Sequence, residues 1–449
     1  MRYLPLTDTE REEIKKSLGI SDTKELFKSI PEDKSYFPLN DIPPALSEPE
    51  LVSAFKDLGR KNIFREYLSF LGAGAYAHFI PEVVSYLSAK GEFLTPYTPY
   101  QPEVSQGNLQ AIFEYQTMMT MLTGLDMANA SLYDGGTAAA EAVLMAVRKS
   151  GRQRVLLAES LHPEYIAIVR AYVQNLPIEL VTVKINRQDG RVDLHDLQAK
   201  CNGETATFVF QSPNFLGLVE NSAALSTVAH QAQAYAVQVV TEAMSLAYLR
   251  PPVDFAVDIV VGEAQSFGLS LGFGGPYLGF ITAKEEFLRQ MPGRIVGQTK
   301  DLDGKRGFVL TLSTREQHIK REKATSNICS NEAWCALRAG MYLATMGKDG
   351  LQRAAADSHL NAAYFVRGAA GLPNVDVVYK RNFYNEVLLE IKKGTAADFL
   401  AALKKNKILA GVPMDWFYPD VTHRVLLAFT EVHSRNDIDI LLRVMGEYS

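Results

Sequence analysis

A repeated alternation between short apolar segments and stretches with helical spacing limits most strongly how this chain can fold. It begins near residue 107, and the apolar segments are continuous rather than alternating in and out. Strands of this kind are buried on both faces, which occurs when helices cover both sides of a mostly parallel sheet. We therefore predict an α/β fold. The predicted strands are RVLLA (154–158), IELVTVKI (178–185), ATFVF (206–210), AVQVV (236–240), VDIVV (257–261) and YLGFITA (277–283).

The pattern changes on both sides of this region. Residues 1–65 are polar and interrupted by prolines, so we expect an N-terminal arm that docks on another surface rather than a domain with its own core. Beyond about residue 330, two long helical stretches are followed by three strand-like segments and a terminal helix, with Ser434 as its expected N-cap. We therefore expect a large α/β domain over residues 66–330 and a smaller α+β domain over residues 331–449.

Composition and charge exclude several classes of function. The chain has 449 residues and a formal net charge of −5, which is too small to indicate binding to nucleic acid or to an anionic membrane. The first residues are charged and no apolar run is long enough to span a bilayer, so we expect neither a signal peptide nor a membrane segment. Cys201, Cys329 and Cys335 lack metal-ligand spacing, and their odd number argues against a disulfide framework. We expect a cytoplasmic protein without a metal site.

A glycine-containing loop, LYDGGTAAAEA (132–142), is the first candidate for a ligand site. Open parallel sheets bind ligands outside the carboxyl ends of their strands. Gly135 and Gly136 allow a close backbone approach, and Thr137 lies where a helix is expected to start. The free N–H groups and the dipole of a helix start suit a phosphate or a carboxylate. The same pattern is also typical of a tight turn with a threonine cap, and both interpretations stay open.

Two further residues follow successive predicted strands. Glu242 ends the strand in VVTEAMS (239–245), and Gln265 follows the next strand in VVGEAQSFG (260–268). In pyridoxal-phosphate enzymes, an acid in the first place holds the pyridine nitrogen protonated and a lysine in the second forms the Schiff base. Here glutamine stands in the place of the lysine. Taken alone, Glu242 is equally well explained as a solvated or salt-bridged carboxylate.

Six longer segments carry a resemblance that extends over essentially the whole chain. They are LGAGAYAHFIPEVV (71–84), YTPYQPEVSQGNLQAIFEYQT (97–117), SLYDGGTAAAEA (131–142), FGGPYLGF (273–280), PGRIVGQT (292–299) and REQHIKREKATSNICSNEA (315–333). With these segments the sequence resembles the P-protein of the glycine cleavage system, a pyridoxal-phosphate-dependent glycine decarboxylase. The resemblance is closest to the α subunit (subunit 1) of its split, two-chain form.

The resemblance implies a fold-type I, aminotransferase-like large domain and an α2β2 heterotetramer. In that assembly a lysine-bearing β subunit holds pyridoxal phosphate covalently, glycine loses CO2, and the aminomethyl group passes to the lipoyl arm of H-protein. The β subunit has histidine and lysine where this chain has Ala264 and Gln265. The nitrogen of a carboxamide is delocalised into its carbonyl and is not nucleophilic. We therefore expect no catalytic residue in this chain, no covalent cofactor, and no activity of the isolated chain.

The resemblance also implies that this chain can complete the pocket of its partner. His162 lies near where the family stacks a histidine on the pyridine ring, although a simple strand-end histidine explains it better. Lys323 lies in a basic segment that would suit an acidic lipoyl carrier or a carboxylate, or a solvated face. The loop YTPYQPEVSQG is the best candidate, and the alternative is a rigid loop that packs at a subunit interface. Its candidate residues are Tyr97, Tyr100, Gln101 and Gln106.

Two other hypotheses stay open. The chain can be a non-enzymatic scaffold or regulatory paralogue of a pyridoxal-phosphate enzyme. Alternatively, it can be a complete pyridoxal-phosphate enzyme that uses an unexpected lysine, for which Lys284 and Lys323 are the candidates. The second of these hypotheses predicts that the isolated chain is yellow, whereas we expect it to be colourless.

Overall fold

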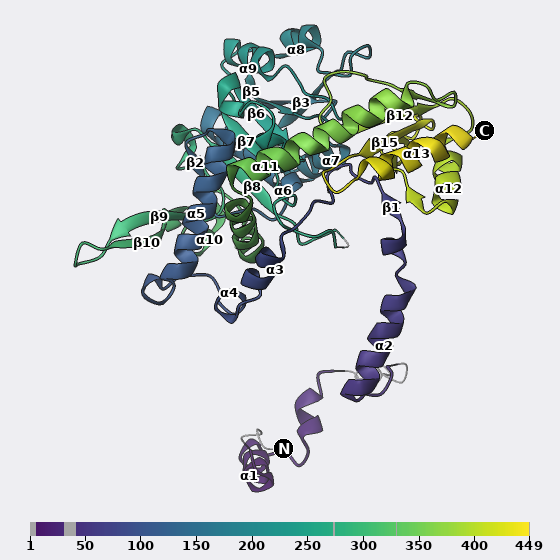
Figure 1. The fold of residues 1–449 in the computed structure, drawn as a ribbon. Coiled ribbons are helices and arrows are strands. Elements are labelled where there is room, and N and C mark those ends of the chain that lie inside the picture. The colour runs from purple at the N-terminus through teal and green to yellow at the C-terminus, as the bar shows by residue number, and fades with distance from the viewer. Residues whose placement is uncertain (1–5, 31–41, 273, 329, 449) are drawn as a thin grey trace. The chain divides into compact units, whose positions relative to one another are not determined.

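The computed structural model describes residues 6–30, 42–272, 274–328 and 330–448. The chain divides into two compact units, Met1–Arg65 and Glu66–Ser449, and each is described by itself. Figure 1 shows the ribbon with its elements labelled.

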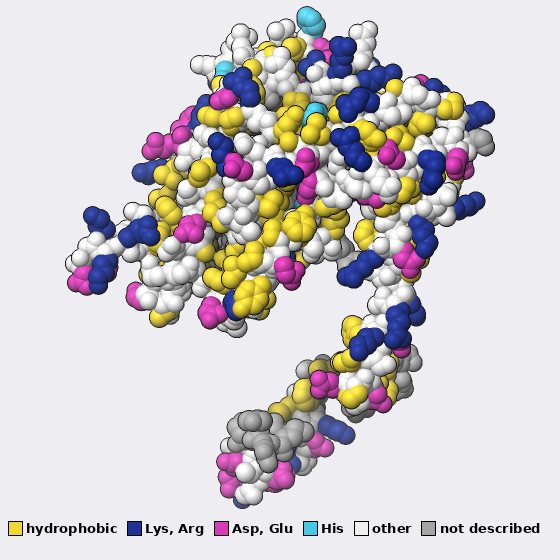
Figure 2. Space-filling view, viewed as in Figure 1, with side chains coloured by type: hydrophobic (Ala, Val, Ile, Leu, Met, Phe, Trp, Pro, Cys, Tyr) yellow, Lys and Arg dark blue, Asp and Glu magenta, His cyan; other side chains and the backbone are white. Residues whose placement is uncertain are grey.

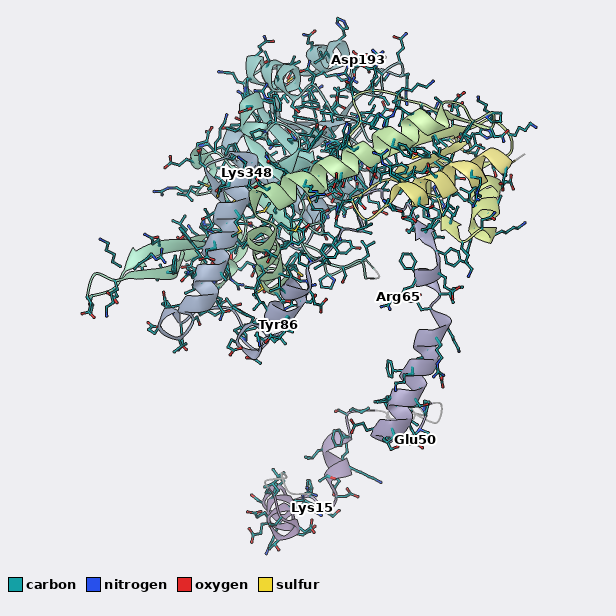
Figure 3. All side chains as sticks on the ribbon, viewed as in Figure 1. Lys15, Glu50, Arg65, Tyr86, Asp193 and Lys348 are labelled. Carbon is teal, nitrogen blue, oxygen red and sulfur yellow. The ribbon has the colours of Figure 1, made fainter. Side chains whose placement is uncertain are left out.

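The first unit consists of short helices that are held by their caps rather than by a core. Its α-helices are α1 (Asp8–Leu18) and α2 (Glu48–Lys61), and neither contains a buried residue. At the start of α2, the carboxylate of Glu50 (Figure 3) accepts from the N–H of Ser47 at 2.9 Å and from the Ser47 hydroxyl at 2.6 Å. Leu51, Phe55 and Leu58 on α2 are 45%, 66% and 57% exposed, so this helix presents an apolar face that the unit itself does not cover.

The second unit is built on a seven-stranded sheet with the order β2-β8-β7-β6-β5-β3-β4. Strands β3 to β7 pair in parallel, whereas β8 runs antiparallel to β7 and pairs with β2. The prediction of a mostly parallel α/β sheet is therefore confirmed, and all six predicted segments contain a strand. The bounds are β2 (Met127–Ala128), β3 (Arg154–Ala158), β4 (Glu179–Val183), β5 (Thr205–Gln211), β6 (Tyr235–Val240), β7 (Ile259–Glu263) and β8 (Gly279–Ala283).

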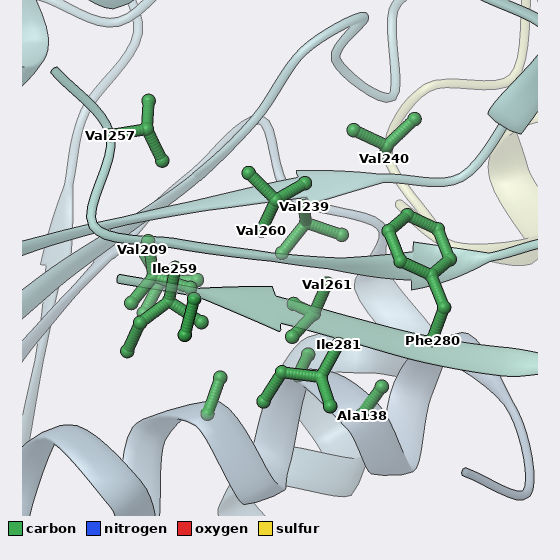
Figure 4. Close-up of a cluster of buried hydrophobic side chains, with 14 of the residues drawn as sticks. Ala138, Val209, Val239, Val240, Val257, Ile259, Val260, Val261, Phe280 and Ile281 are labelled. Carbon is green, nitrogen blue, oxygen red and sulfur yellow. The ribbon is translucent and has the colours of Figure 1, made fainter. Parts of the chain in front are cut away.

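Helices lie on both faces of this sheet, as the continuous apolar strands require. Ala138 of the alanine-rich helix α6 is fully buried against the sheet, where Val239, Val261 and Ile281 also lie in the core (Figure 4). Asp193 (Figure 3) is the N-cap of α8 and accepts from the backbone N–H groups of His195 and Asp196. The helices are α5 (Gln106–Thr123), α6 (Gly135–Ser150), α7 (Pro163–Val173), α8 (Leu194–Lys200) and α9 (Ser222–Gln231).

The C-terminal part begins with a long kinked helix, α11 (Ala333–Ala369). The kink is at Gly347, whose φ of 59° lies in the left-handed region that favours glycine, and it separates the two helical stretches that the sequence predicts. Because α11 contributes side chains to two hydrophobic cores, the division of the chain at residue 330 stays a prediction.

A four-stranded antiparallel sheet with the order β11-β12-β15-β14 follows α11. The terminal helix α13 (Arg435–Glu447) begins with the expected N-cap, Ser434, whose side chain accepts from the N–H of Asp437. Near the N-terminal end of this unit, β1 (Leu68–Ser69) pairs with β13 (Ile408–Leu409), which ties the start of the unit to its C-terminal part. The other bounds are β11 (Val375–Val377), β12 (Glu386–Ile391), α12 (Ala396–Lys405), β14 (Val412–Pro413) and β15 (Arg424–Ala428).

Two absences apply to the described part of the chain. No helix there is long and apolar enough to cross a membrane. Among the same residues, no group of three or more His, Cys, Asp or Glu side chains is placed to hold a metal ion.

Candidate functional site

Gln265, the residue in the expected place of the lysine, is 1% exposed and lies just beyond β7. Its Nε2 donates to the carbonyl oxygens of Tyr76, at 3.0 Å, and of Leu269, at 2.7 Å. Its Oε1 accepts from the N–H of Tyr76 at 2.9 Å. Both N–H donors of the carboxamide are therefore used, one within its own loop at Leu269 and one, together with Oε1, on the backbone of a segment far away in the sequence.

That segment is residues 72–79, which we call the crevice segment. It lies at the carboxyl ends of the parallel strands, where open sheets of this type bind ligands. His162, which follows β3, contacts the carbonyl oxygen of Ala73 through Nε2 at 2.8 Å. From the C-terminal sheet, Glu386 accepts from the N–H of Ala73 at 2.7 Å and from the hydroxyl of Tyr76 at 3.0 Å. Side chains from both parts of the unit thus converge on it.

Glu242, the candidate acid for a ring nitrogen, is 2% exposed and binds the crevice segment through His78. The distance from His78 Nε2 to Glu242 Oε2 is 3.0 Å, and His78 Nδ1 lies 2.7 Å from Glu431 Oε2. The other oxygen of Glu242 accepts from the Ser266 hydroxyl at 2.6 Å and from the Met244 N–H at 2.9 Å. Glu242 is therefore neither solvated nor open to a ligand.

The charge of this cluster follows from its two carboxylates. Burial by itself lowers the pKa of His78, but Glu242 and Glu431 outweigh it and raise the pKa to about 10. Burial likewise opposes ionisation of Glu431, yet its hydrogen bond with His78 holds its pKa below the ordinary value. Near neutral pH, an imidazolium therefore stands between two carboxylate positions.

The start of α6, the candidate phosphate site, is also occupied by acidic side chains of the chain. Asp134 caps the helix by accepting from the N–H of Thr137 at 2.7 Å. The N–H of Gly135 donates to Glu263 Oε2 at 3.0 Å. Glu263 is 3% exposed, and burial raises its pKa to about 7. The carboxyl group of Glu263 thus takes a backbone N–H group that an external anion would need.

Both glycines at this helix start allow close packing. A Cβ on Gly135 would lie 2.2 Å from the hydroxyl oxygen of Tyr165, and one on Gly136 would lie 2.4 Å from Cδ1 of Ile168. A side chain at either position would therefore force Tyr165 or Ile168 to shift. In this chain, the backbone at both glycines lies close to neighbouring side chains.

His162 is buried and its two ring nitrogens are both engaged. Nδ1 accepts from the N–H of Glu164 at 3.2 Å, which makes His162 the N-cap of α7 and requires that Nε2 donates to Ala73. The rings of Tyr165 and Phe215 lie 5.0 Å and 4.7 Å from its ring, centre to centre. Burial lowers the pKa of His162, so the ring is neutral at pH 7.

These residues do not fit pyridoxal phosphate. The position of the amine is a carboxamide that is saturated by backbone groups, and the acid for the ring nitrogen binds His78. The start of α6 donates to Glu263. The groups in the places of the amine and the acid, and an N–H group at the candidate phosphate site, are thus already bound within the chain.

The loop YTPYQPEVSQG lies before α5 and carries the exposed candidates. Tyr97 is 84% exposed and Gln101 is also exposed, so both are free to meet another molecule. Tyr100 is 55% exposed and its hydroxyl accepts from Arg294 Nη2 at 3.0 Å. Arg294 is only 5% exposed, so this hydrogen bond attaches the exposed Tyr100 ring to a buried side chain.

Gln106, the last candidate of this loop, has a structural contact instead. Its Oε1 accepts from the N–H of Phe308 at 2.8 Å, and its Nε2 donates to the carbonyl oxygens of Phe308 and Pro102. It thereby attaches the hairpin of β9 (Ile295–Lys300) and β10 (Arg306–Thr311) to the start of α5.

The candidate lysines lie in different surroundings. Lys284 follows the antiparallel strand β8, whose end lies at the sheet edge opposite the crevice, and it forms an ion pair with Asp258. Lys323 is exposed in a short 3-10 turn, Arg321–Lys323.

Arg315, which opens the basic segment, is buried. Its guanidinium donates to the carbonyl oxygens of Leu312 and Gly293, each at 3.1 Å, and to that of Met291. It holds the backbone of its own chain together, so it is not available to an acidic carrier.

The sequence reasoning missed several residues of the site, among them Glu386 and Glu431 of the C-terminal part, and His78 and Glu263. His78 and Glu263 both lie within quoted motifs, yet neither was expected to contact Glu242 or the start of α6. A signal was present for each: a lone histidine follows the small residues of GAGAYA, and an acid ends the apolar strand in VVGE.

Comparison with known proteins gives the same family from sequence and from structure. The family model for the glycine cleavage system P-protein matches residues 1–445. The chain is 45% identical over 445 residues to probable glycine dehydrogenase (decarboxylating) subunit 1 of Moorella thermoacetica, covering 99% of both chains. It is 44% identical over 448 residues to the protein of the same name from Desulfitobacterium hafniense, covering 100% of both.

Solved structures agree with this assignment. The crystal structure of a glycine decarboxylase (P-protein) of the glycine cleavage system, in inhibitor-bound form, matches with a TM-score of 0.88 at 40% identity and covers 100% of both chains. A cysteine desulfurase from Thermococcus onnurineus matches with a TM-score of 0.64 at 16% identity, covering 90% of this chain and 99% of that one, and shows the fold alone. The fold is that of the fold-type I pyridoxal-phosphate enzymes, and the chain belongs to the family of the glycine cleavage system P-protein, in which it is similar to subunit 1 proteins.

Proposed function

We propose that this chain is the lysine-free subunit of a two-chain glycine decarboxylase. A lysine-bearing partner, in an α2β2 assembly, holds the pyridoxal phosphate that draws electrons from glycine as CO2 leaves. The aminomethyl group then passes to the lipoyl arm of H-protein. One observation carries the proposal: in a chain similar to subunit 1 proteins from end to end, the position of the amine is a buried, saturated carboxamide. This chain therefore depends on a second chain for chemistry.

The contribution of this chain would come from its surface. Hydrophobic side chains gather around α3 (Glu82–Ser88) (Figure 2), and Tyr86 on this helix (Figure 3) is 61% exposed. The loop with Tyr97 and Tyr100 follows α3 in the chain, after the short helix α4 (Gly91–Leu94). Exposed aromatic side chains with a polar end are typical anchors of protein interfaces. We propose that this surface binds the partner and that Tyr97, Tyr100 and Gln101 reach its pocket.

The filled crevice also favours a second candidate function, which is that of a scaffold. A scaffold would bind the partner through the same surface without shaping the active site. The two functions differ in what they predict for the loop, because only a pocket-completing loop affects turnover once the complex has formed.

Reconstitution with a lysine-bearing partner tests both candidates. We expect glycine–bicarbonate exchange by the complex, little or none when this chain is omitted, and a loss of about tenfold or more for Tyr97→Ala or Tyr100→Phe if the loop orients reacting groups. Trp416→Ala is the matched control, because Trp416 is an exposed aromatic residue (73%) outside the loop. Full exchange by the partner alone would contradict the proposed function. Loss of exchange when this chain is omitted, together with unchanged exchange in both loop variants, would favour the scaffold function.

A further inference from the structure

We infer that the crevice of this chain is a closed centre that binds the chain's own residues 72–79 in place of any cofactor or substrate. The inference rests on contacts within this chain and holds whether or not the complex decarboxylates glycine.

The backbone of the crevice segment is bound as a ligand would be. Polar groups of Ala73, Tyr76, Ala77 and Phe79 each meet a side chain that comes from elsewhere in the chain. Buried backbone groups need such partners, and here side chains rather than a strand ladder supply them. The side chains that bind the segment are His162, Gln265, Glu386, Thr430 and Glu431.

The buried charged side chains of the crevice are also paired with each other. Glu242 is an acid at the end of a buried strand, and such a group needs a cation or strong donors. His78 supplies the positive charge, and Glu431 binds the opposite side of the same ring. An external cation at Glu242 would have to displace His78 and would leave Glu431 buried without its partner. Removing one member of a buried ion pair is strongly unfavourable.

The shape of the crevice segment depends on its small residues. A Cβ on Gly72 would lie 2.4 Å from Cβ of Ala428 and 2.7 Å from Oε1 of Glu386. Gly74 has a φ of 110°, and a Cβ there would lie 3.1 Å from Nε2 of His162. The segment therefore lies in direct contact with the walls of the crevice, and the sequence GAGAYAH fits it closely.

A first experiment uses the unaltered full-length chain and pyridoxine 5′-phosphate, which has the ring and phosphate of the cofactor but no aldehyde to react with surface lysines. We expect no saturable binding in equilibrium dialysis up to millimolar concentration. Hydrogen exchange should be slow at the Tyr76 amide, which donates to buried Gln265, and should not change when the compound is added. Saturable one-to-one binding that alters exchange in residues 72–79 would overturn the inference, and so would rapid exchange at Tyr76.

A second experiment restores the amine with Gln265→Lys. After incubation with pyridoxal phosphate and borohydride reduction, we expect no adduct at position 265, because the crevice segment still excludes the cofactor. Gln352→Lys is the matched control: it places a lysine at an exposed position of α11 and should be labelled. An adduct at position 265 would overturn the inference. Should the first variant fail to fold, the dialysis and exchange measurements on the unaltered chain decide the question independently.

Discussion

The imidazole of His78 carries a positive charge in a place that water hardly reaches, since its side chain is 2% exposed. The groups that face it are the carboxylates of Glu242 and Glu431, which in turn accept hydrogen bonds from Ser266 and Ser358. Buried charges of this kind stabilise a fold only while each has its partner. The effect of His78 on stability should therefore depend on pH.

The direction of this pH dependence follows from the direction in which folding shifts the pKa of His78. The pKa of His78 rises from an ordinary value of 6.5 to about 10 on folding, so its contribution is complete below pH 6.5 and is lost as the pH rises through about 10. We expect His78→Gln to lower the free energy of unfolding by about 3–5 kcal/mol near pH 6.5, and by progressively less toward pH 10. Urea denaturation at several pH values measures this difference. His195→Gln, at an exposed position, should show no such trend, and a His78 effect that is constant with pH would contradict the assignment.

Individual site residues were predictable from sequence only in part. Glu242, Gln265 and His162 were identified because each follows a strand that is recognisable by its apolar run, and Gly135 because paired glycines precede an expected helix start. Their contacts were not predictable, because the crevice segment comes from a part of the chain far before these strands. A hydrogen bond such as that of Gln265 with Tyr76 depends on the tertiary fold and leaves no local pattern.

At the scale of elements, α2 of the N-terminal unit has an apolar face without a cover in its own unit. Leu51, Phe55 and Leu58 are spaced so that they lie on one side of the helix. Helices with such a face are stable when they bury it against another surface. We expect that surface to belong to the partner subunit.

Phe55→Glu tests the role of α2. Burying a phenylalanine contributes about 1.5–3 kcal/mol, so we expect the variant to weaken association with the partner by roughly tenfold or more. Ser53→Glu adds the same charge on another side of the helix and should bind normally. Sedimentation or calorimetric titration with the partner measures the difference. Equal affinities for the two variants would show that α2 docks elsewhere.

Strands β3 to β8 were predictable because burial on both faces of the sheet leaves a continuous apolar run in the sequence. The direction of β8 was not predictable from its composition, because a buried apolar strand has the same sequence pattern in either direction. Direction depends on the connection, and the described residues between β7 and β8 form no crossover helix. The role of Gln106 was missed for a similar reason: the hairpin that it holds is remote in sequence.

For the whole molecule, a closed crevice fixes the cofactor content of the assembly. If only the partner binds pyridoxal phosphate, an α2β2 complex contains one cofactor for each pair of chains. We expect alkaline release and fluorescence to give this ratio, and the isolated chain to be colourless. A ratio of two per pair would show that both crevices are loaded. Catalytic activity does not enter the measurement, so it separates cofactor content from turnover.

Because His78 joins Glu242 of the seven-stranded sheet to Glu431 beyond β15, one imidazole links the two halves of the larger unit. Enzymes that close over a substrate need a hinge that lets such halves swing apart and together. Here the buried contacts of His78 with Glu242 and Glu431 hold the two halves together. We therefore expect the two halves of this unit to move little relative to each other.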